Sequence, residues 1–196
     1  MPQKPQKFKS PAKVPDKRPL GKSSKSVRVD VKKICSIDHE CIGCSEVSKS
    51  CCARYDVCVT KAEMKKIVAV LPEAAEFARG LKTENGYANV FGEAEEGAHS
   101  IDTHENGLCV FAFKQKGLIR CSLHAVETKL GLPLGTVKPK VCILWPLTFN
   151  ERGDTLTLHD DALGCACSSV RKKESDQISP DLRKTIEYFH GRSTNK

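Results

Sequence analysis

The sequence has no apolar run long enough to cross a membrane and few aromatic residues with which to fill a core. Hydrophobic residues make up 39% of its 196 residues and aromatic residues 6%, whereas a membrane span needs about 18 consecutive apolar residues. The first residues also lack the apolar stretch of a secretory signal peptide. We therefore expect a cytoplasmic protein with no membrane partner, whose thiols meet a reducing environment.

The motifs of several common enzyme classes are also missing. The sequence contains no Gly-x-Ser-x-Gly, no Walker phosphate-binding loop and no Gly-x-Gly-x-x-Gly. These motifs mark many hydrolases, nucleotide-binding proteins and dinucleotide-binding domains. None of these classes is supported, and the sequence does not decide whether the protein is an enzyme.

The positive charge is concentrated at the N-terminus. The first 33 residues contain eleven Lys and Arg, two acidic residues and five of the ten prolines, and the other 163 residues sum to −1. We therefore expect a disordered basic tail over residues 1–33 and a folded domain over residues 34–196. Such a tail can be a solvated leader, or it can contact nucleic acid or another anionic surface in a salt-dependent manner.

The local patterns predict a mixture of short helices and hairpins. Thr60 and Glu63 have the spacing of a capping box at the start of a helix over 61–70, and Pro72 begins a second short helix that ends near Phe77. Further helices are expected at 124–131 and 180–190, hairpins at 109–124 and 141–160, and a short strand at 87–91. The expected fold is α+β, small and loop-rich, and organised around metal.

Cysteine is the residue in excess. The sequence has eleven, and their odd number excludes complete internal disulfide pairing. In a reducing compartment, clustered cysteines are more often metal ligands or redox groups than disulfides. Cys35 and Cys58 can be read as small buried hydrophobic residues. The other nine form three groups: Cys41, Cys44, Cys51 and Cys52; Cys109, Cys121 and Cys142; Cys165 and Cys167.

Cys41 and Cys44 have the spacing of a chelating turn. The two residues between them, one of which is the small Gly43, form a tight turn that lets both sulfurs reach one ion. Tetrahedral zinc sites and iron–sulfur clusters both use four thiolates of this kind. Cys51 and Cys52 are adjacent, and in an extended segment adjacent side chains point to opposite faces. We expect one of them to join Cys41 and Cys44, and the other to face a second site or the core.

The motifs occur in a recognisable order over residues 41–147: Cys-x2-Cys, Cys-Cys, VTKAEMKKI, CVFAFKQKGLIRCSLH, KPKVC and WPL. In this combination the sequence resembles the bacterial and archaeal cysteine-cluster proteins of the YkgJ type, which are described as zinc- or iron-chelating domains. The six residues between Cys44 and Cys51 exceed the usual gap in that family.

The resemblance implies two groups of metal ligands. The first is Cys41, Cys44, Cys51 and Cys52, and the second is Cys109, Cys121 and Cys142, with Lys138 and Pro139 where the family has a basic residue and a proline. Cys165 and Cys167 lie outside the family pattern and could complete a set of four with the second group. His124 follows Cys121 by three residues and is a further candidate ligand, because a neutral imidazole binds zinc and iron.

These residues predict a metal-binding protein that ligates zinc or an iron–sulfur cluster, such as a [4Fe–4S] cluster. A cluster would serve electron transfer or a redox step, whereas a closed zinc site would be structural. Two alternatives stay open. One is a cluster-dependent enzyme, either an oxidoreductase or a methylase, because flagellin lysine methylases carry a similar cysteine cluster. The other is a zinc-stabilised nucleic-acid-binding adaptor whose basic tail provides affinity.

Overall fold

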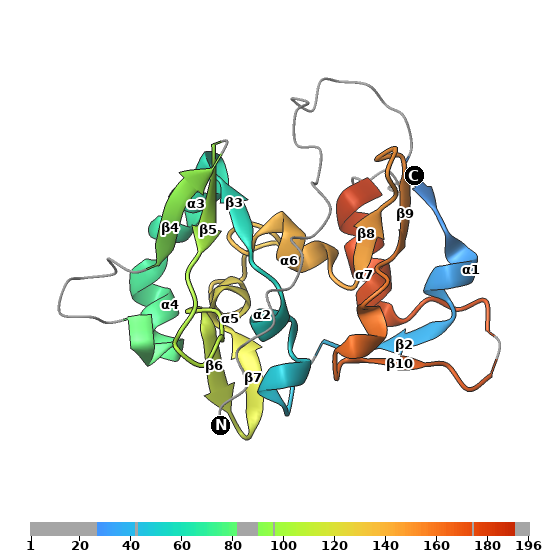
Figure 1. Ribbon diagram of the computed structural model, residues 1–196, viewed down its shortest axis with the longest axis horizontal. Helices are drawn as coiled ribbons and strands as arrows, with labels where there is room; N and C mark the ends of the chain where they lie inside the picture. The colour runs from blue at the N-terminus through green and yellow to red at the C-terminus, as the bar shows by residue number, and fades with distance from the viewer. Residues whose placement is uncertain (1–26, 42, 82–89, 96, 174, 191–196) are drawn as a thin grey trace, which may run out of the picture.

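The protein folds into two lobes that meet along a narrow junction (Figure 1). The computed structural model describes residues 27–41, 43–81, 90–95, 97–173 and 175–190. In this part of the chain there are seven α-helices and ten β-strands in four small sheets, which confirms the predicted α+β class. We call the lobe built from residues 57–139 the middle lobe, and the lobe built from both ends of the described chain the terminal lobe.

The middle lobe contains one three-stranded sheet, one hairpin and three helices. The sheet is antiparallel with the order β3-β5-β4, and the hairpin pairs β6 with β7. Its core contains the buried side chains of Val59, Ile67, Phe111, Leu123 and Val126. The elements are β3 (Cys58–Thr60), α3 (Lys61–Val68), α4 (Leu71–Phe77), β4 (Phe91–Glu95), β5 (Ala98–Ile101), β6 (Ala112–Gln115), β7 (Leu118–Cys121) and α5 (Ser122–Lys129).

The terminal lobe brings the two ends of the described chain together. Strand β1 pairs in parallel with β9, which pairs with β8, and β2 pairs with β10. A separate core contains Ile34, Ile37, Leu147, Leu156 and Leu182. The elements are β1 (Arg28–Val29), α1 (Val31–Ile34), β2 (Ile37–His39), β8 (Leu147–Phe149), β9 (Thr155–Leu158), β10 (Ser168–Val170) and α7 (Pro180–His190).

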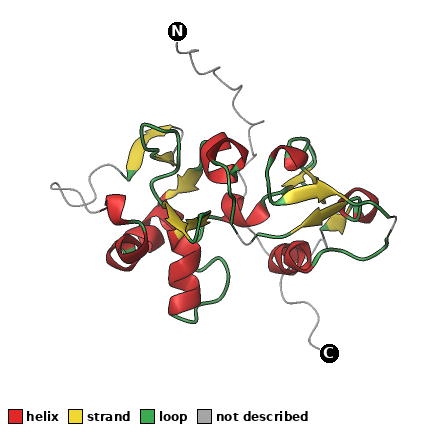
Figure 2. Ribbon diagram, turned by 90° about the horizontal axis from the view of Figure 1, so that it is seen from below, coloured by secondary structure: helices red, strands yellow, loops and turns green. Residues whose placement is uncertain are grey.

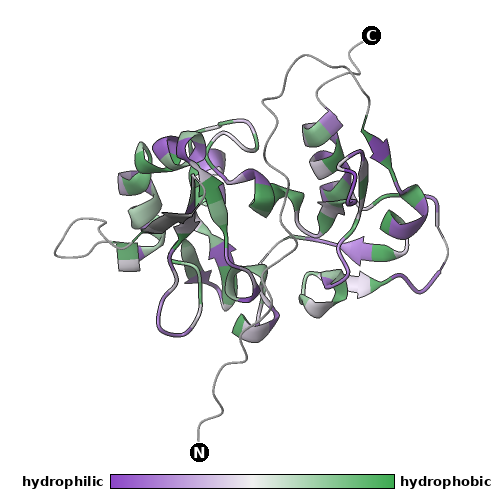
Figure 3. Ribbon diagram, turned by 45° about the horizontal axis from the view of Figure 1, so that its top comes forward, coloured by the Kyte–Doolittle hydropathy of each residue, from purple (hydrophilic) through white to green (hydrophobic). Residues whose placement is uncertain are grey.

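Two short helices, α2 (Cys51–Arg54) and α6 (Lys140–Leu144), lie between the lobes (Figure 1). Figure 2 shows the strands in two groups on either side of this region, and Figure 3 shows hydrophobic segments in both lobes. A third and smaller cluster contains the buried residues Cys44, Leu108 and Ile119, with Cys52 packed against them. The junction is therefore lined partly by cysteine.

Most of the predicted elements are present. Thr60 and Glu63 form the capping box of α3, both hairpins are formed, and the last helix covers 180–190 as expected. The expected strand at 87–91 falls mostly outside the described residues, and β4 begins at Phe91. No helix in the part of the chain that the structure describes is long and apolar enough to cross a membrane.

Some predictions were wrong. Residues 141–144 form helix α6 rather than a strand, because the carboxylate of Glu63 accepts the Lys140 amide at 3.0 Å and stabilises the first turn. The folded part begins before residue 34, since β1 pairs with β9 and Asp30 caps α1; residues 1–26 of the predicted tail lie outside the described residues. Cys35 is buried as expected, but Cys58 is exposed.

The capping box gives a first testable prediction. The Thr60 hydroxyl accepts the Glu63 amide at 3.2 Å, and the Glu63 carboxylate accepts the Thr60 amide at 3.0 Å. Replacing Thr60 by Val keeps the shape but removes the acceptor, so we expect a loss of about 1 kcal/mol in the free energy of unfolding, measured in urea with reductant. Thr60→Ser retains the acceptor and should stay near wild type. Equal losses in the two variants would contradict this role.

Candidate metal centre

The segment that carries Cys41, Cys44, Cys51 and Cys52 is fixed to the middle lobe through its backbone. Cys44 pairs with Ile119 of β7 in both directions, at 3.1 and 2.7 Å, and the Cys109 amide donates to the Cys52 carbonyl at 2.8 Å. Gly43 allows this close approach. Its φ is +119°, and a Cβ there would lie 3.0 Å from the Ile119 oxygen, so a larger residue would be strained and would clash.

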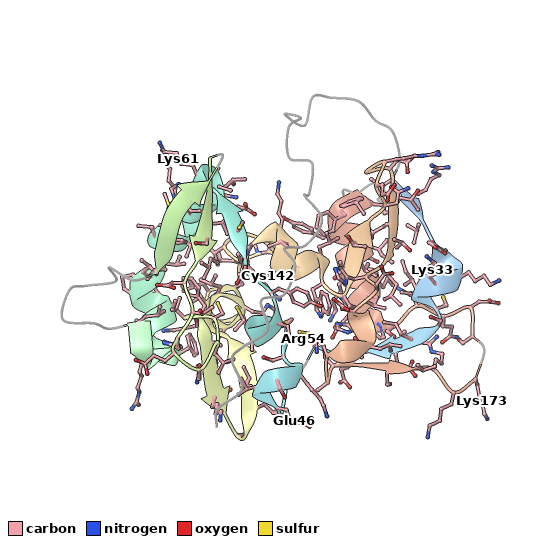
Figure 4. The ribbon with its side chains drawn as sticks, in the orientation of Figure 1. Lys33, Glu46, Arg54, Lys61, Cys142 and Lys173 are labelled. Atoms are coloured by element: carbon pink, nitrogen blue, oxygen red, sulfur yellow. The ribbon has the colours of Figure 1, made fainter. Side chains whose placement is uncertain are left out.

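The same segment is also fixed to the terminal lobe. The Ala166 amide donates to the Lys49 carbonyl at 2.9 Å, and the Arg54 guanidinium donates to the Gly164 carbonyl at 3.2 Å. Figure 4 labels Arg54 and Cys142, which both lie in the strip between the lobes. Residues 44–54 are therefore held from both sides, and the side chains of α2 lie at the junction.

Four thiols lie on the middle-lobe side of the junction, and we call them the middle set: Cys52, Cys109, Cys121 and Cys142. Burial, together with the charge of Cys121, raises the pKa of Cys109 to about 12 and also raises that of Cys142 well above its ordinary value. The charges of Cys121 and Cys109 also help to raise the pKa of Cys52, after the larger effects of its hydrogen bond to Cys51 and of burial. The sulfurs from β7, α2, α6 and the loop before β6 therefore influence one another electrostatically.

Four other thiols interact around Cys167, and we call them the terminal set: Cys41, Cys44, Cys165 and Cys167. The backbone of Cys44 itself is paired with β7 of the middle lobe. The thiols of Cys165 and Cys44 donate hydrogen bonds to the Cys167 sulfur, which hold the pKa of Cys167 far below its ordinary value and raise the pKa of both donors. Desolvation by the surrounding protein raises the pKa of Cys41 to about 11, although this residue as a whole is exposed.

Cys51 and Lys138 lie between the two sets. The Cys52 thiol donates a hydrogen bond to Cys51 and lowers its pKa, and the charge of Cys51 acts on thiols of both sets, including Cys142 and Cys165. Burial lowers the pKa of Lys138. The interaction of its ammonium group with the sulfurs of Cys41, Cys121 and Cys142 raises it and outweighs burial, so the pKa of Lys138 lies above its ordinary value. A cation and a ninth thiol thus connect the sets electrostatically.

Backbone amides act on two sulfurs of the middle set. Burial raises the pKa of Cys121, and the amides of Leu123 and His124 in the first turn of α5 act in the opposite direction. The amides of Phe111 and Ala112 do the same for Cys109. Amide dipoles that point at sulfur stabilise thiolate charge, which is the form of cysteine that binds metal.

The sulfurs are neighbours, but they do not converge on one point. Among the described residues, no group of three or more His, Cys, Asp or Glu side chains is arranged so that it could hold a metal ion as it stands. The chemistry of the donors nevertheless fits soft, thiolate-binding metals, because each set offers four sulfurs.

The structure groups the predicted ligands differently from the sequence. Cys165 and Cys167 lie with Cys44, rather than completing a set with Cys109, Cys121 and Cys142. Cys51 and Cys52 are on a helical turn instead of an extended segment. Adjacent side chains on a helix point about 100° apart, and the expectation that these two cysteines serve different sites stays a prediction.

The structure also shows the surroundings of two histidines, His124 and His39. The imidazole of His124 is half exposed and lies 3.8 Å from the buried carboxylate of Glu127, so its place among the ligands stays a prediction. His39 was not among the predicted ligands, yet it is buried and acts on Cys167. The alternation of buried Ile37, exposed Asp38 and buried His39 along β2 is the sequence signal that could have identified it.

Comparisons with known proteins give no relative from which to transfer a role. No family model, no curated protein and no solved structure matches the chain.

Glu127 supports the loop that leads to Lys138 and Cys142, and it gives a second prediction. Its Oε1 atom accepts the amides of Val137 and Lys138 at 2.9 and 2.8 Å, and its side chain is 3% exposed. Glu127→Ala leaves two enclosed donors without this acceptor, and we expect a loss of about 1 to 3 kcal/mol in the free energy of unfolding, measured in urea. Glu127→Gln retains an acceptor and should lose less.

The pH dependence of the free energy of unfolding, compared between wild type and Glu127→Gln, tests the charge on Glu127. Burial raises its pKa, but His124 and the two amides outweigh burial, so the pKa lies below its ordinary value. A lowered pKa stabilises the folded protein at neutral pH, and this contribution is lost as the pH falls through the folded-state pKa. The stability gap between wild type and Glu127→Gln should therefore narrow in acid. A gap that widens in acid would contradict this assignment.

Proposed function

We propose that this protein binds metal through thiolate centres at the junction of its two lobes, with zinc or an iron–sulfur cluster as the bound species. The observation that carries the proposal is that nine thiols, from three separated groups in the sequence, influence one another electrostatically in the folded protein. The middle set and the terminal set would each provide four sulfurs to one centre. This is also the function that the resemblance to the YkgJ type implies.

An alternative explanation is that these cysteines only fill space as small hydrophobic residues. That explanation suits Cys35, which is 7% exposed and belongs to neither set. It does not account for thiols that hydrogen-bond to one another, as Cys44, Cys165 and Cys167 do, since contacts between thiols add no packing advantage over Ala or Val. A group of thiols that interact with one another is instead the arrangement we expect of metal ligands in a metal-free protein.

Electrostatics supports the same proposal. Burial raises the pKa values of Cys109, Cys121 and Cys142, because thiolate charge is costly in a low-dielectric site. Lys138 provides one positive charge, which is less than four thiolates would need. A divalent metal supplies the remainder and lets the thiols deprotonate, so metal binding should release protons and join the lobes, with binding energy appearing as folding energy.

Anaerobic purification followed by metal and sulfide analysis tests the proposal. A brown protein with acid-labile sulfide identifies an iron–sulfur cluster, and a colourless protein with stoichiometric zinc identifies zinc centres. We expect Cys109→Ser and Cys165→Ser each to lose about half of the bound metal, because they belong to different sets. The matched control Cys35→Ala should retain all of it. A reduced wild-type protein that takes up neither metal, with eleven freely titratable thiols, would refute the function.

The proposed compartment and partner follow from the same chemistry. Free thiols of this number are compatible with the reducing cytoplasm, which we propose as the location. Residues 1–26 contain eight Lys and Arg and one acidic residue, so we propose an anionic polymer such as nucleic acid as the partner of this segment.

Deleting residues 1–26 tests this partner without disturbing strand β1. The full chain should bind a mixed-sequence nucleic acid with an affinity that falls as salt rises, and the shortened chain should lose most of this binding while keeping its metal. Fluorescence anisotropy across a salt series measures both effects. Equal affinity of the two chains would exclude this role for the segment.

A further inference from the structure

Glu127 of α5 is a buried carboxylate with only one of its two oxygens in hydrogen bonds. Its side chain is 3% exposed, and its Oε1 atom accepts the amides of Val137 and Lys138 at 2.9 and 2.8 Å. Its Oε2 atom is enclosed and has no hydrogen-bond partner among the residues that the structure describes. A buried acceptor without a donor is costly, so a donor brought to Oε2 stabilises the folded protein.

The imidazole of His124 faces this oxygen. Its Nδ1 atom lies 3.8 Å from Oε2 of Glu127, and the ring is 52% exposed. The two residues are three apart on α5 and therefore lie on the same face of the helix. The distance exceeds that of a hydrogen bond, and a ring with this exposure is free to rotate and close it. Because the two ring nitrogens lie on different edges, Nε2 is directed away from the carboxylate.

This pairing fixes where the ring proton lies. A carboxylate only accepts hydrogen bonds, so a neutral His124 paired with Glu127 carries its proton on Nδ1. The lone pair is then on Nε2, and a neutral nitrogen of this kind is the form in which imidazole binds metal. Histidines that ligate metal almost always donate their other ring N–H to a carboxylate, a carbonyl or water. Glu127 and His124 have the arrangement of such a ligand and its support.

The start of α5 places the ring beside a thiol of the middle set. Cys121 ends β7 and is the N-cap residue of α5, and His124 is the third residue of this helix. The side chain of an N-cap residue lies over the first turn, close to the backbone of the third residue. Cys121 is only partly buried, as is His124. A thiolate and an imidazole are therefore offered together at the partly exposed edge of the middle set.

We propose that Glu127 is a positioning residue for metal binding: it holds His124 with Nε2 free, and His124 takes the place of one sulfur in the middle centre. This inference rests on the proposed function and adds a nitrogen donor to it. Three thiolates and one imidazole are a common ligand set of closed zinc sites. Loss of a carboxylate that supports a ligating histidine typically costs about 10- to 100-fold in metal affinity.

Zinc affinity in two backgrounds tests the ligand and its support. Cys165→Ser removes a sulfur of the terminal set and leaves the middle set intact, and Cys109→Ser does the reverse. In the Cys165→Ser background we expect His124→Asn and Glu127→Gln each to weaken zinc binding about 10- to 100-fold, measured by competition with a chromogenic chelator. In the Cys109→Ser background the same two substitutions should leave zinc affinity unchanged.

These substitutions separate a metal ligand from a structural contact. The Asn amide can donate to Glu127 as Nδ1 does, but it offers no second nitrogen to a metal. The Gln oxygen can still accept the two loop amides, whereas its NH2 group donates to Nδ1 of His124 and moves the ring proton to Nε2. Glu76→Gln is the matched control, because it removes a carboxylate of the middle lobe that pairs with Lys129, and it should keep wild-type zinc affinity.

Three results would overturn the inference. Unchanged zinc affinity in His124→Asn excludes the ligand role, and unchanged affinity in Glu127→Gln excludes the positioning role. A loss of affinity in both backgrounds indicates a general loss of structure and not a specific effect on the middle centre.

A second readout needs no metal. Nitrogen-15 NMR of the reduced, metal-free protein, at a pH at which the ring is neutral, reports which nitrogen of His124 carries the proton. We expect Nδ1 in wild type and Nε2 in Glu127→Gln. A chain that binds zinc but carries this proton on Nε2 in wild type overturns the inference alone, whereas a wild-type chain that binds no zinc overturns the proposed function. The two failures are therefore distinguishable.

Discussion

The junction between the two lobes is the constraint on which the rest of the structure depends. Each lobe has its own apolar core, around Phe111 in one and around Leu156 in the other. Between them lie thiols and the packed rings of Tyr55, Trp145 and His159. A thiol gains little from burial compared with a large aliphatic side chain. A metal shared by sulfurs of several elements would add to the contacts that already join the lobes, such as the ring contact of Tyr55 with Trp145.

The charge of ionised thiols is a second constraint at this junction. Neighbouring thiols cannot all ionise in an enclosed site unless positive charge or dipoles compensate them. Lys138 and the amides in the first turn of α5 supply part of that compensation on one side, and His39 and two thiol donors supply it to Cys167 on the other. The two sets therefore differ in which groups offset thiolate charge, and this difference sets the thiol pKa values apart in two otherwise similar groups of cysteines.

The sequence predicted local features better than the arrangement of the site. The capping box at Thr60, the two hairpins and the last helix follow from short-range patterns, because capping, turn chemistry and period are local properties. The grouping of Cys165 and Cys167 with Cys44 depends on the pairing of β2 with β10, which joins residues about 130 positions apart. His39 was missed for the same reason, since its partner Ser168 is distant in the chain. Residues 141–144 became helical because Glu63, also distant, caps them.

The adjacency of Cys51 and Cys52 places the two sets under one mechanical constraint. Both residues belong to the single turn of α2, so their sulfurs leave the backbone about 100° apart and cannot be moved independently. Cys52 packs toward the middle lobe, where its carbonyl accepts the Cys109 amide, while the charge of Cys51 reaches Cys165 in the terminal lobe. Any rotation of α2 that tightens one set must therefore reposition the sulfur offered to the other. If each set binds a metal as proposed, the two centres would therefore act as one coupled unit.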